Sequence, residues 1–317
     1  MKTAAPAAAV PTPVATAGAG SRAAVPPEIM RLVRRLELRT RGLVNARYAG
    51  EYKSVFKGQG MEFAEVREYQ AGDEVRSIDW NVSARMRRPF VKRYVEEREL
   101  TVLLVVDCSG SANVGTGERF KRELAAEVAA TLALLAVRSN DRVGAVLFTD
   151  EVELGIPPRK GRRHALRVVR DVLAHASDHT RTDIGAALSY ARRAMRHRSV
   201  VFILSDFIAP PFEKELRLLA SRHDVVAITL EDPGEKVLPD IGVARLIDPE
   251  TGESLEVDTS SDRVRAEFSR AVIAERDARR KLFRGFAIDE IVVRTDGDVA
   301  RPLVAFFRAR ERRRRRG

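Results

Sequence analysis

Five oxygen-bearing side chains at three separate places in the sequence form the candidate site. Two of the places directly follow uninterrupted apolar runs, residues 102–106 and 200–204, and the third precedes an expected helix. An apolar run bounded by polar residues predicts a strand that is buried on both faces of a sheet. Ligands of open α/β sheets bind just beyond the carboxyl ends of such strands. The five residues are Asp107, Ser109, Ser111, Thr182 and Asp206.

The chemistry of this set indicates a divalent cation. Carboxylate and hydroxyl oxygens are hard donors, which suit a magnesium-type ion that keeps several of its waters. Two carboxylates and three hydroxyls would neutralise the ion and leave one octahedral position open for a carboxylate from outside. This arrangement binds a ligand, and it needs neither a general base nor a nucleophile. We therefore expect Mg²⁺, with Mn²⁺ or Ca²⁺ as alternatives, and no catalytic residue.

Each of these residues also has an ordinary structural use. Thr182 suits the N-cap of a helix that begins at Asp183, and Asp206 suits the cap of a turn before Pro210. Ser109 and Ser111 are common loop residues. A coincidence of all five at matching strand ends is much rarer than any one of these uses, so metal binding is the favoured interpretation.

The charge of the chain first suggests a nucleic-acid partner, because the formal net charge of the 317 residues is +11. Residues 306–317, however, hold seven arginines and one glutamate, so much of the excess lies in a basic tail. Such a tail could neutralise phosphates without reading sequence, but a solvated terminus is the commoner case. Nucleic-acid binding is therefore an alternative to the metal-site interpretation.

Several features favour a cytoplasmic protein. The single cysteine, Cys108, excludes an internal disulfide and fits a reducing compartment. No apolar stretch approaches the roughly 20 residues that cross a bilayer. Residues 1–27 are rich in alanine and proline, which predicts a disordered leader and argues against a signal peptide.

The order of the remaining elements predicts an α/β fold. Apolar strands alternate with helices, so the sheet should be mainly parallel with right-handed crossovers. Residues 28–99 should form an N-terminal helix and an irregular β-containing segment, followed by a main domain over 100–305. The main domain should contain strands at 102–106, 141–149, 199–205, 224–230 and 288–295, a hairpin at 244–258, and helices at 118–135, 162–175, 183–196, 212–222 and 262–283.

Two details of this prediction concern surfaces. Phe120 and Leu124 should face inwards from the first of these helices, and Phe268 and Ile273 from the last. Within residues 43–98, aromatic side chains such as Trp80 alternate with charged ones. This mixture fits either structural ion pairs or a docking face.

The five-residue pattern resembles the metal-ion-dependent adhesion site of the von Willebrand factor A-type fold. The D-x-S-x-S motif corresponds to Asp107, Ser109 and Ser111, the isolated threonine to Thr182, and the isolated aspartate to Asp206. The context TDIGAAL after Arg181 is also typical of that fold. The resemblance implies a mainly parallel sheet with helices on both faces, in which the hydroxyls bind the metal directly and the aspartates bind it directly or through water.

The upstream text GQGMEF…REYQAGD…RSIDW resembles, more narrowly, the bacterial family called domain of unknown function fifty-eight. That family is commonly associated with MoxR-type AAA+ ATPases. The resemblance therefore implies a non-enzymatic adaptor or co-chaperone that binds an acidic residue of a protein partner through Mg²⁺. Members often carry membrane helices near the N-terminus, whereas this sequence shows none.

Three further chemistries deserve comparison with this one. The stretch GSANVGT at residues 110–116 lacks the lysine of a phosphate-binding loop, which argues against ATP hydrolysis. A magnesium-dependent phosphoester hydrolase remains open, because Asp107 could attack phosphorus. His175 and His179 have the i, i+4 spacing of a zinc site on a helix, but the residues between them predict a loop.

Overall fold

The computed structural model describes residues 62–95, 99–117 and 119–316, together with residues 31, 33–35, 52, 55 and 56. The predicted leader at 1–27 and most of the predicted first helix lie outside the described residues.

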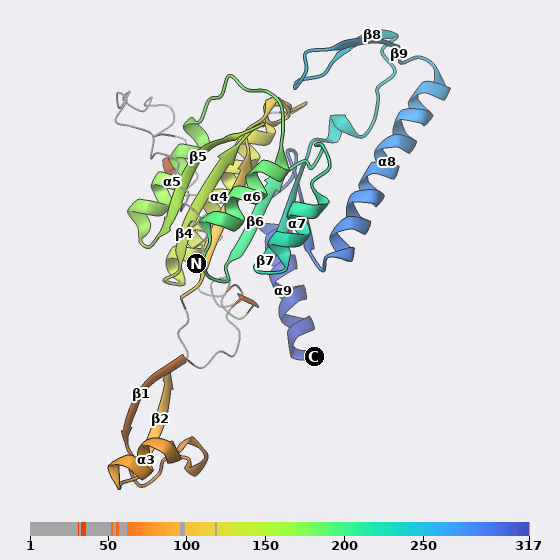
Figure 1. Cartoon of the computed structure of the whole chain (residues 1–317). Helices are drawn as coiled ribbons and strands as arrows, with labels where there is room; N and C mark the ends of the chain where they lie inside the picture. The colour runs from red at the N-terminus through yellow and green to blue at the C-terminus, as the bar shows by residue number, and fades with distance from the viewer. Residues whose placement is uncertain are drawn as a thin grey trace, which may run out of the picture.

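A six-stranded sheet forms the centre of the molecule, in the order β10-β7-β6-β3-β4-β5 (Figure 1). All neighbouring strands are parallel except β4 and β5, which are antiparallel. The predicted mixed α/β fold with a mainly parallel sheet is therefore confirmed. The strands are β3 (Thr101–Asp107), β4 (Arg142–Phe148), β5 (Val152–Arg159), β6 (Val200–Ser205), β7 (Asp224–Glu231) and β10 (Asp289–Arg294).

Strand β5 was not predicted from the sequence. It contains Gly155, Pro157 and Pro158, which are typical of turns. The strand lies at the edge of the sheet, where a proline is tolerated because its missing N–H does not interrupt a ladder on both sides.

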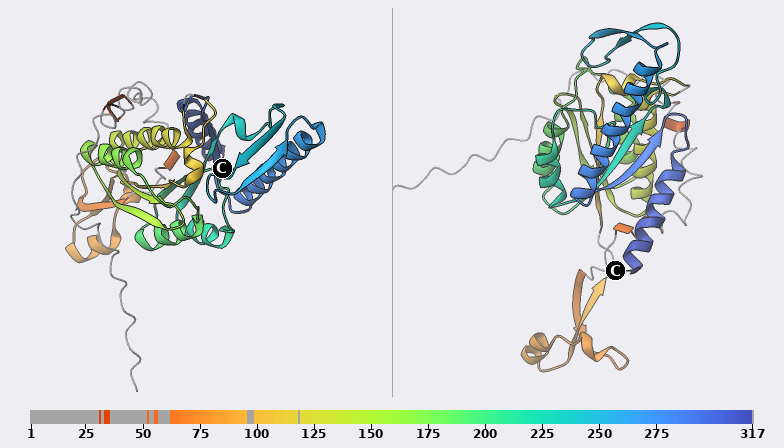
Figure 2. Two further views of the ribbon diagram at one scale, coloured as in Figure 1. Left: turned by 90° about the horizontal axis from the view of Figure 1, so that it is seen from above. Right: turned by 90° about the vertical axis from the view of Figure 1, so that its right-hand side faces the viewer.

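Helices cover both faces of the sheet (Figures 1 and 2). Alternate residues of β3 point to opposite faces, so Val102 and Leu104 pack with one group of helices and Leu103 and Val105 with the other. The first group contains α4 (Lys121–Arg138), α5 (Arg162–Ala174) and α9 (Ala300–Arg316). The second contains α6 (Ile184–Ala194), α7 (Glu213–Ala220) and the last turns of α8 (Asp262–Gly285).

Two helices differ from the prediction in what they bury. Helix α4 begins at Lys121 rather than near residue 118, and Phe120 is 42% exposed instead of facing the core. On α8, Phe268 is half-buried but Ile273 is 49% exposed, and Phe283 is the buried residue of this helix. The reason is visible in Figure 1, where most of α8 runs alongside the molecule and extends past the sheet.

The predicted hairpin is present as strands β8 (Val243–Ile247) and β9 (Ser254–Asp258). It forms a separate two-stranded sheet between β7 and α8 in chain order. Figure 1 shows it beyond one end of the central sheet.

The N-terminal unit consists of β1 (Glu62–Glu68), the 3-10 helix η1 (Val75–Ser77), α3 (Trp80–Met86) and β2 (Phe90–Val95). Helix α3 was not predicted. The Asp79 carboxylate caps it by accepting from the backbone N–H groups of Asn81 and Val82. Arg67 and Asp73 form a bidentate ion pair at 2.8 and 2.7 Å, which supports the structural interpretation of the charges there.

The arginine-rich end of the chain continues a helix. The predicted boundary at residue 306 falls inside α9, because Phe306 and Phe307 are buried against the sheet core. Further along, Arg310 donates to both carboxylate oxygens of Asp224 at 2.6 Å. Within the part of the chain that the structure describes, no helix is both long and apolar enough to span a membrane.

Candidate functional site

The two aspartates of the candidate site meet because their strands are neighbours. Strands β3 and β6 pair in parallel with Val106 opposite Leu204, so Asp107 and Asp206 emerge at the same edge of the sheet. The Ser205 hydroxyl links the strand ends by donating to Asp107 Oδ2 at 2.6 Å. The pairing of β3 with β6 therefore places both aspartates at one edge.

The two serines occupy the loop after β3. The backbone N–H of Ser109 donates to Asp107 Oδ1 at 3.0 Å, which turns the chain back over the strand end. The Ser109 and Ser111 hydroxyl oxygens lie 3.1 Å apart. Next to them, the Gly110 N–H donates to the Thr180 carbonyl at 2.7 Å. This backbone bond brings the loop that carries Thr182 to the same edge.

Thr182 does not cap helix α6. The N-cap is Asp183, whose carboxylate accepts from the Ala186 N–H at 2.9 Å, so the capping alternative for Thr182 is wrong. The Thr182 hydroxyl instead donates to Glu250 Oε1 at 2.6 Å. Glu250 belongs to the turn between β8 and β9 and is not one of the five residues predicted from the sequence.

Asp206 has both a structural contact and a charged partner. Its Oδ1 accepts from the Ile208 N–H at 3.1 Å, which confirms the turn-capping use. Its Oδ2 lies 3.0 Å from Lys121 Nζ, and the same ammonium group pairs with Glu235. The following residue, Phe207, has φ 63°, a left-handed conformation that is uncommon for a bulky residue.

Most of the site residues are buried, and burial raises the pKa of the carboxyl groups among them. Asp107, Ser109, Thr182 and Asp206 are all buried, and Ser111 is half-buried. Burial, and secondarily the Asp206 carboxylate, raise the pKa of Asp107 to about 6. Burial also raises the pKa of Glu250, with the Asp206 carboxylate adding to the effect.

Lys121 compensates only part of this negative charge. Burial alone would lower its pKa, but the carboxylates of Asp206 and Glu235 outweigh burial and raise it. The Lys121 ammonium group pairs with the carboxylates of Asp206 and Glu235, whereas Asp107 and Glu250 each experience the negative charge of Asp206. The excess of acidic groups favours a cation at this edge of the sheet.

The five predicted ligands suit a magnesium-type ion because all of their donor atoms are oxygens. The structure gathers two carboxylates and three hydroxyls from three loops, and these are oxygen donors of the kind that Mg²⁺ prefers. Across the described residues, no group of three or more His, Cys, Asp or Glu side chains is arranged to hold a metal. A metal here would therefore depend on the hydroxyl groups.

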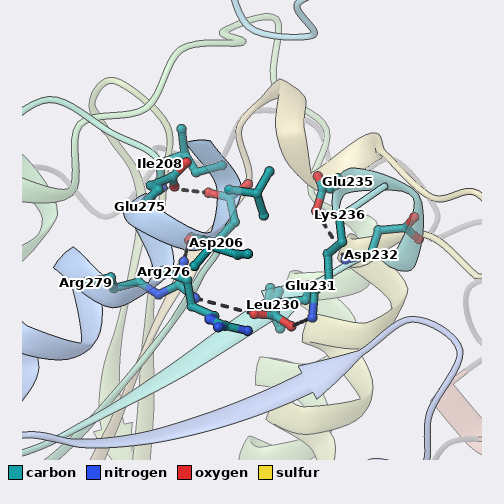
Figure 3. A pocket seen from close by; sticks show the side chains of 12 residues that line it. Asp206, Ile208, Leu230, Glu231, Asp232, Glu235, Lys236, Glu275, Arg276 and Arg279 are labelled. Atoms are coloured by element: carbon teal, nitrogen blue, oxygen red, sulfur yellow. Dashed lines mark hydrogen bonds and ion pairs between the residues drawn. The ribbon is translucent and has the colours of Figure 1, made fainter. Parts of the chain in front are cut away.

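A pocket borders the site on the side of α8 (Figure 3). Asp206 and Lys236 line it together with Arg279 of α8. Arg279 Nη1 donates to the Asp206 carbonyl at 3.4 Å, and Arg279 Nη2 lies 3.4 Å from Glu231 Oε1. The cationic groups of Arg279 and Lys236 both pair with Glu231, so Arg279 connects Glu231 to the loop after β6.

Four residues that take part in the site carry no clear signal in the sequence: Lys121, Ser205, Glu235 and Glu250. Lys121 is the first residue of α4, where a lysine ordinarily faces solvent, yet it is 1% exposed. Ser205 was visible as the last strand residue next to Asp206. Glu250 lies in the stretch PETGE, whose composition indicates only a turn.

Two alternative reactive groups find no support in the structure. The Cys108 thiol is half-buried, and burial raises its pKa well above the ordinary value, which disfavours a nucleophilic thiolate. Helix α5 ends at Ala174, so His175 and His179 do not share a helix face, and the predicted loop is confirmed. His175 Nε2 lies 3.7 Å from Glu153, and His179 Nδ1 lies 2.9 Å from Asp150.

Comparisons with known proteins give one family match and several uncharacterized relatives. The family model described as "Protein of unknown function DUF58" matches residues 65–278. An uncharacterized protein of Mycobacterium tuberculosis is 34% identical over 289 residues, which cover 90% of this chain and 91% of the relative. An uncharacterized protein of Mycobacterium avium is 33% identical over 160 residues, which cover 50% of this chain and 94% of the relative.

Two solved structures show a distant similarity to the chain. The conserved hypothetical protein BatB from Bacteroides thetaiotaomicron has a TM-score of 0.44 and 15% identity, covering 68% of this chain and 99% of that chain. An aerotolerance-related membrane protein from Bacteroides fragilis has a TM-score of 0.47 and 14% identity, with the same coverage. With TM-scores below 0.5, neither structure carries a functional argument.

Proposed function

The chain belongs to the family of proteins of unknown function DUF58, and we propose that it is a metal-dependent protein-interaction module of the von Willebrand factor A type. The observation that carries the proposal is the convergence of Asp107, Ser109 and Thr182 with Asp206 at one sheet edge. Four of the five predicted ligands are buried there, and acidic groups outnumber the one ammonium group beside them.

In this proposal a divalent ion, Mg²⁺ first among candidates, is held by the hydroxyls of Ser109, Ser111 and Thr182 and by the carboxylates of Asp107 and Asp206. When bound, the ion supplies a coordination position for a carboxylate oxygen of another protein. The chain's own residues orient the donors: Ser205 fixes Asp107, and Lys121 fixes Asp206. The module binds and performs no reaction.

The proposed partner is a MoxR-type AAA+ ATPase that presents an acidic residue, for which the chain would act as adaptor or co-chaperone. This part rests on the family resemblance of the residues around Gly58 to Trp80. As part of the same proposal, the protein works in the cytoplasm, where a single cysteine such as Cys108 stays reduced.

Two alternative functions have less support. A phosphoester hydrolase would use Asp107 as nucleophile, but Asp107 is only 4% exposed, which gives a phosphoester little access to its carboxylate. Nucleic-acid binding would use the arginines of α9, but Arg310 and Arg313 pair with Asp224 and Asp289.

The metal proposal is tested by urea unfolding of the full chain in excess Mg²⁺ and in EDTA. A ligand that binds only the native state at 100 times its Kd adds about 2.7 kcal/mol to the free energy of unfolding. Asp107→Asn should abolish this difference, and Asp296→Asn, on the exposed loop after β10, should retain it. Equal stability of the wild type in both solutions would contradict the proposal.

A further inference from the structure

The turn between β8 and β9 places a carboxylate of the chain itself in the candidate site. Glu250 Oε1 accepts from the Thr182 hydroxyl at 2.6 Å, and a hydrogen bond with the Ser109 side chain is a further contact of this carboxyl group. Glu250 is also close enough to Asp206 for the two carboxylates to repel each other. Three of the five proposed metal ligands therefore surround Glu250.

The backbone of the turn contacts the same edge. The Thr180 hydroxyl donates to the Glu250 carbonyl at 2.6 Å. A Cβ atom on Gly110 would lie 2.1 Å from the Pro249 carbonyl oxygen, so the turn approaches the loop after β3 more closely than any residue with a side chain would allow. The turn is thus seated against both loops that supply hydroxyl ligands.

Hydrogen bonds within the turn preorganise its backbone for this position. Asp248 Oδ1 accepts from the Glu250 N–H at 2.8 Å, and Asp248 Oδ2 accepts from the Thr251 hydroxyl at 2.9 Å. Gly252 has φ +73°, which a glycine adopts without strain. These local bonds hold the Glu250 backbone in one conformation, which lowers the entropic cost of presenting its carboxylate.

The rest of the hairpin is weakly attached. Among the described strands, β8 and β9 pair with each other alone, and most of their residues are exposed. At the base, the Thr259 hydroxyl donates to the Gly242 carbonyl at 2.6 Å and closes the hairpin on itself. Because an isolated two-stranded hairpin is only marginally stable, the contacts of the turn contribute much of what keeps it on the sheet edge.

We propose that the β8–β9 hairpin is a built-in ligand of the site. Glu250 holds the position that an acidic residue of a partner would take, so a partner binds by displacing the turn. This inference rests on the proposed function, since it assigns Glu250 to the open coordination position of the proposed metal. It also defines the competing group, a glutamate or aspartate carboxylate carried on a tight turn.

The experiment uses the full chain, Mn²⁺ as the metal probe and a matched pair of variants, Glu250→Ala and Glu253→Ala. Glu253 belongs to the same turn and is exposed, whereas Glu250 is half-buried and bonded to Thr182. The water-proton relaxation rate per bound Mn²⁺ reports how many coordinated waters exchange. We expect this rate to rise in Glu250→Ala, where water replaces the carboxylate, and to stay at the wild-type value in Glu253→Ala.

Hydrogen exchange without metal tests the seating of the turn separately. Amides of residues 248–253 should exchange at least about tenfold faster in Glu250→Ala than in Glu253→Ala, because opening of the turn no longer breaks the Thr182 contact. Equal amide exchange rates in the two variants would contradict the inference that Glu250 holds the turn against the site. Equal relaxation rates with Mn²⁺ bound would overturn Glu250 as a ligand while leaving the metal site intact. A wild-type chain that binds no Mn²⁺ would contradict the metal site itself, and this inference with it.

Discussion

The ammonium group of Lys121 lies 3.0 Å from Asp206 Oδ2, with 2% of the lysine side chain exposed. This ion pair connects the start of α4 to the end of β6 across the candidate site. Removing one partner of a buried pair leaves an uncompensated charge, which costs more than the pair itself contributes. Lys121 thus fixes Asp206 Oδ2 at the edge of the sheet.

Replacing Lys121 by methionine should show how much its ammonium group stabilises the protein and how far Mg²⁺ can substitute for it. Lys121→Met keeps the aliphatic length but leaves Asp206 and Glu235 without their cation, so the metal-free protein should lose about 3 kcal/mol of unfolding free energy. Mg²⁺ should restore more stability to this variant than it adds to the wild type, because the ion would compensate the Asp206 carboxylate that has lost its ammonium partner. Urea unfolding with and without Mg²⁺ measures both effects. Lys214→Met, at an exposed position of α7, is the control, and equal stability of the two variants would contradict the role of Lys121.

Ser205 is a positioning residue, because its hydroxyl donates to Asp107 and accepts from the Phe207 N–H at 3.0 Å. Ser205→Ala should cost about 2 kcal/mol of stability, since it leaves a buried carboxylate oxygen and a buried N–H without a partner. It should also weaken Mg²⁺ binding measured by calorimetry, because Asp107 loses its orientation. Ser205→Thr retains the hydroxyl and should recover the affinity. A threonine variant as weak as the alanine variant would indicate a packing effect instead.

Asp232 lines the pocket that borders the candidate site and gives the molecule a pH dependence. Burial alone would raise its pKa, but hydrogen bonds from the side chains of Thr116 and Thr295 and from nearby N–H groups outweigh burial and lower the pKa to about 2. A carboxyl group with a lowered folded-state pKa stabilises the protein above its unfolded-state value of 3.8, and this stabilisation disappears as the pH falls towards 2.

Asp232→Asn should therefore lose about 2 kcal/mol at pH 7, the net contribution of hydrogen bonds to a charged group. The difference in unfolding free energy between the variant and the wild type should decrease steadily as the pH falls from 4 to about 2. Unfolding in urea at several pH values measures the gap. Asp296→Asn, which removes an exposed ion pair with Arg294, should change stability by no more than about 1 kcal/mol at any of them. A gap for Asp232→Asn that stays constant with pH would contradict the prediction.

The sequence was enough to predict that Asp107 and Asp206 lie at one edge of the sheet, because the end of a strand and the residue that follows it can be recognised locally. Apolar runs identify β3 and β6, and the residues that follow them are Asp107 and Asp206. The rule that parallel strands gather their carboxyl ends then brings the two together. Thr182 does not follow a strand; it lies in the loop before α6, where Asp183 rather than Thr182 caps the helix.

The contacts that complete the site could not be predicted in this way. Glu250 is 68 residues from Thr182 in the sequence, and hairpin composition does not say onto which surface a hairpin folds. From the local sequence, Lys121 would be expected to face solvent. Its burial depends on a partner, Asp206, that lies 85 residues further along the chain. Both contacts arise from tertiary packing of charged side chains, which leaves no periodic pattern in the sequence.

The close approach of the hairpin to the loop after β3 gives a test that removes no donor atom. A Cβ atom at Gly110 would collide with the Pro249 carbonyl oxygen at 2.1 Å and press on the Thr180 carbonyl oxygen at 3.2 Å. Gly110→Ala should therefore push the turn off the site, cost about 1–3 kcal/mol of stability as an overpacked contact does, and increase hydrogen exchange at residues 248–253. Gly117→Ala lies in the same loop, where an added Cβ meets nothing within 4 Å, and should leave exchange at the turn unchanged. If Gly110→Ala kept the turn as protected as Gly117→Ala does, the hairpin would not be seated against this loop in solution.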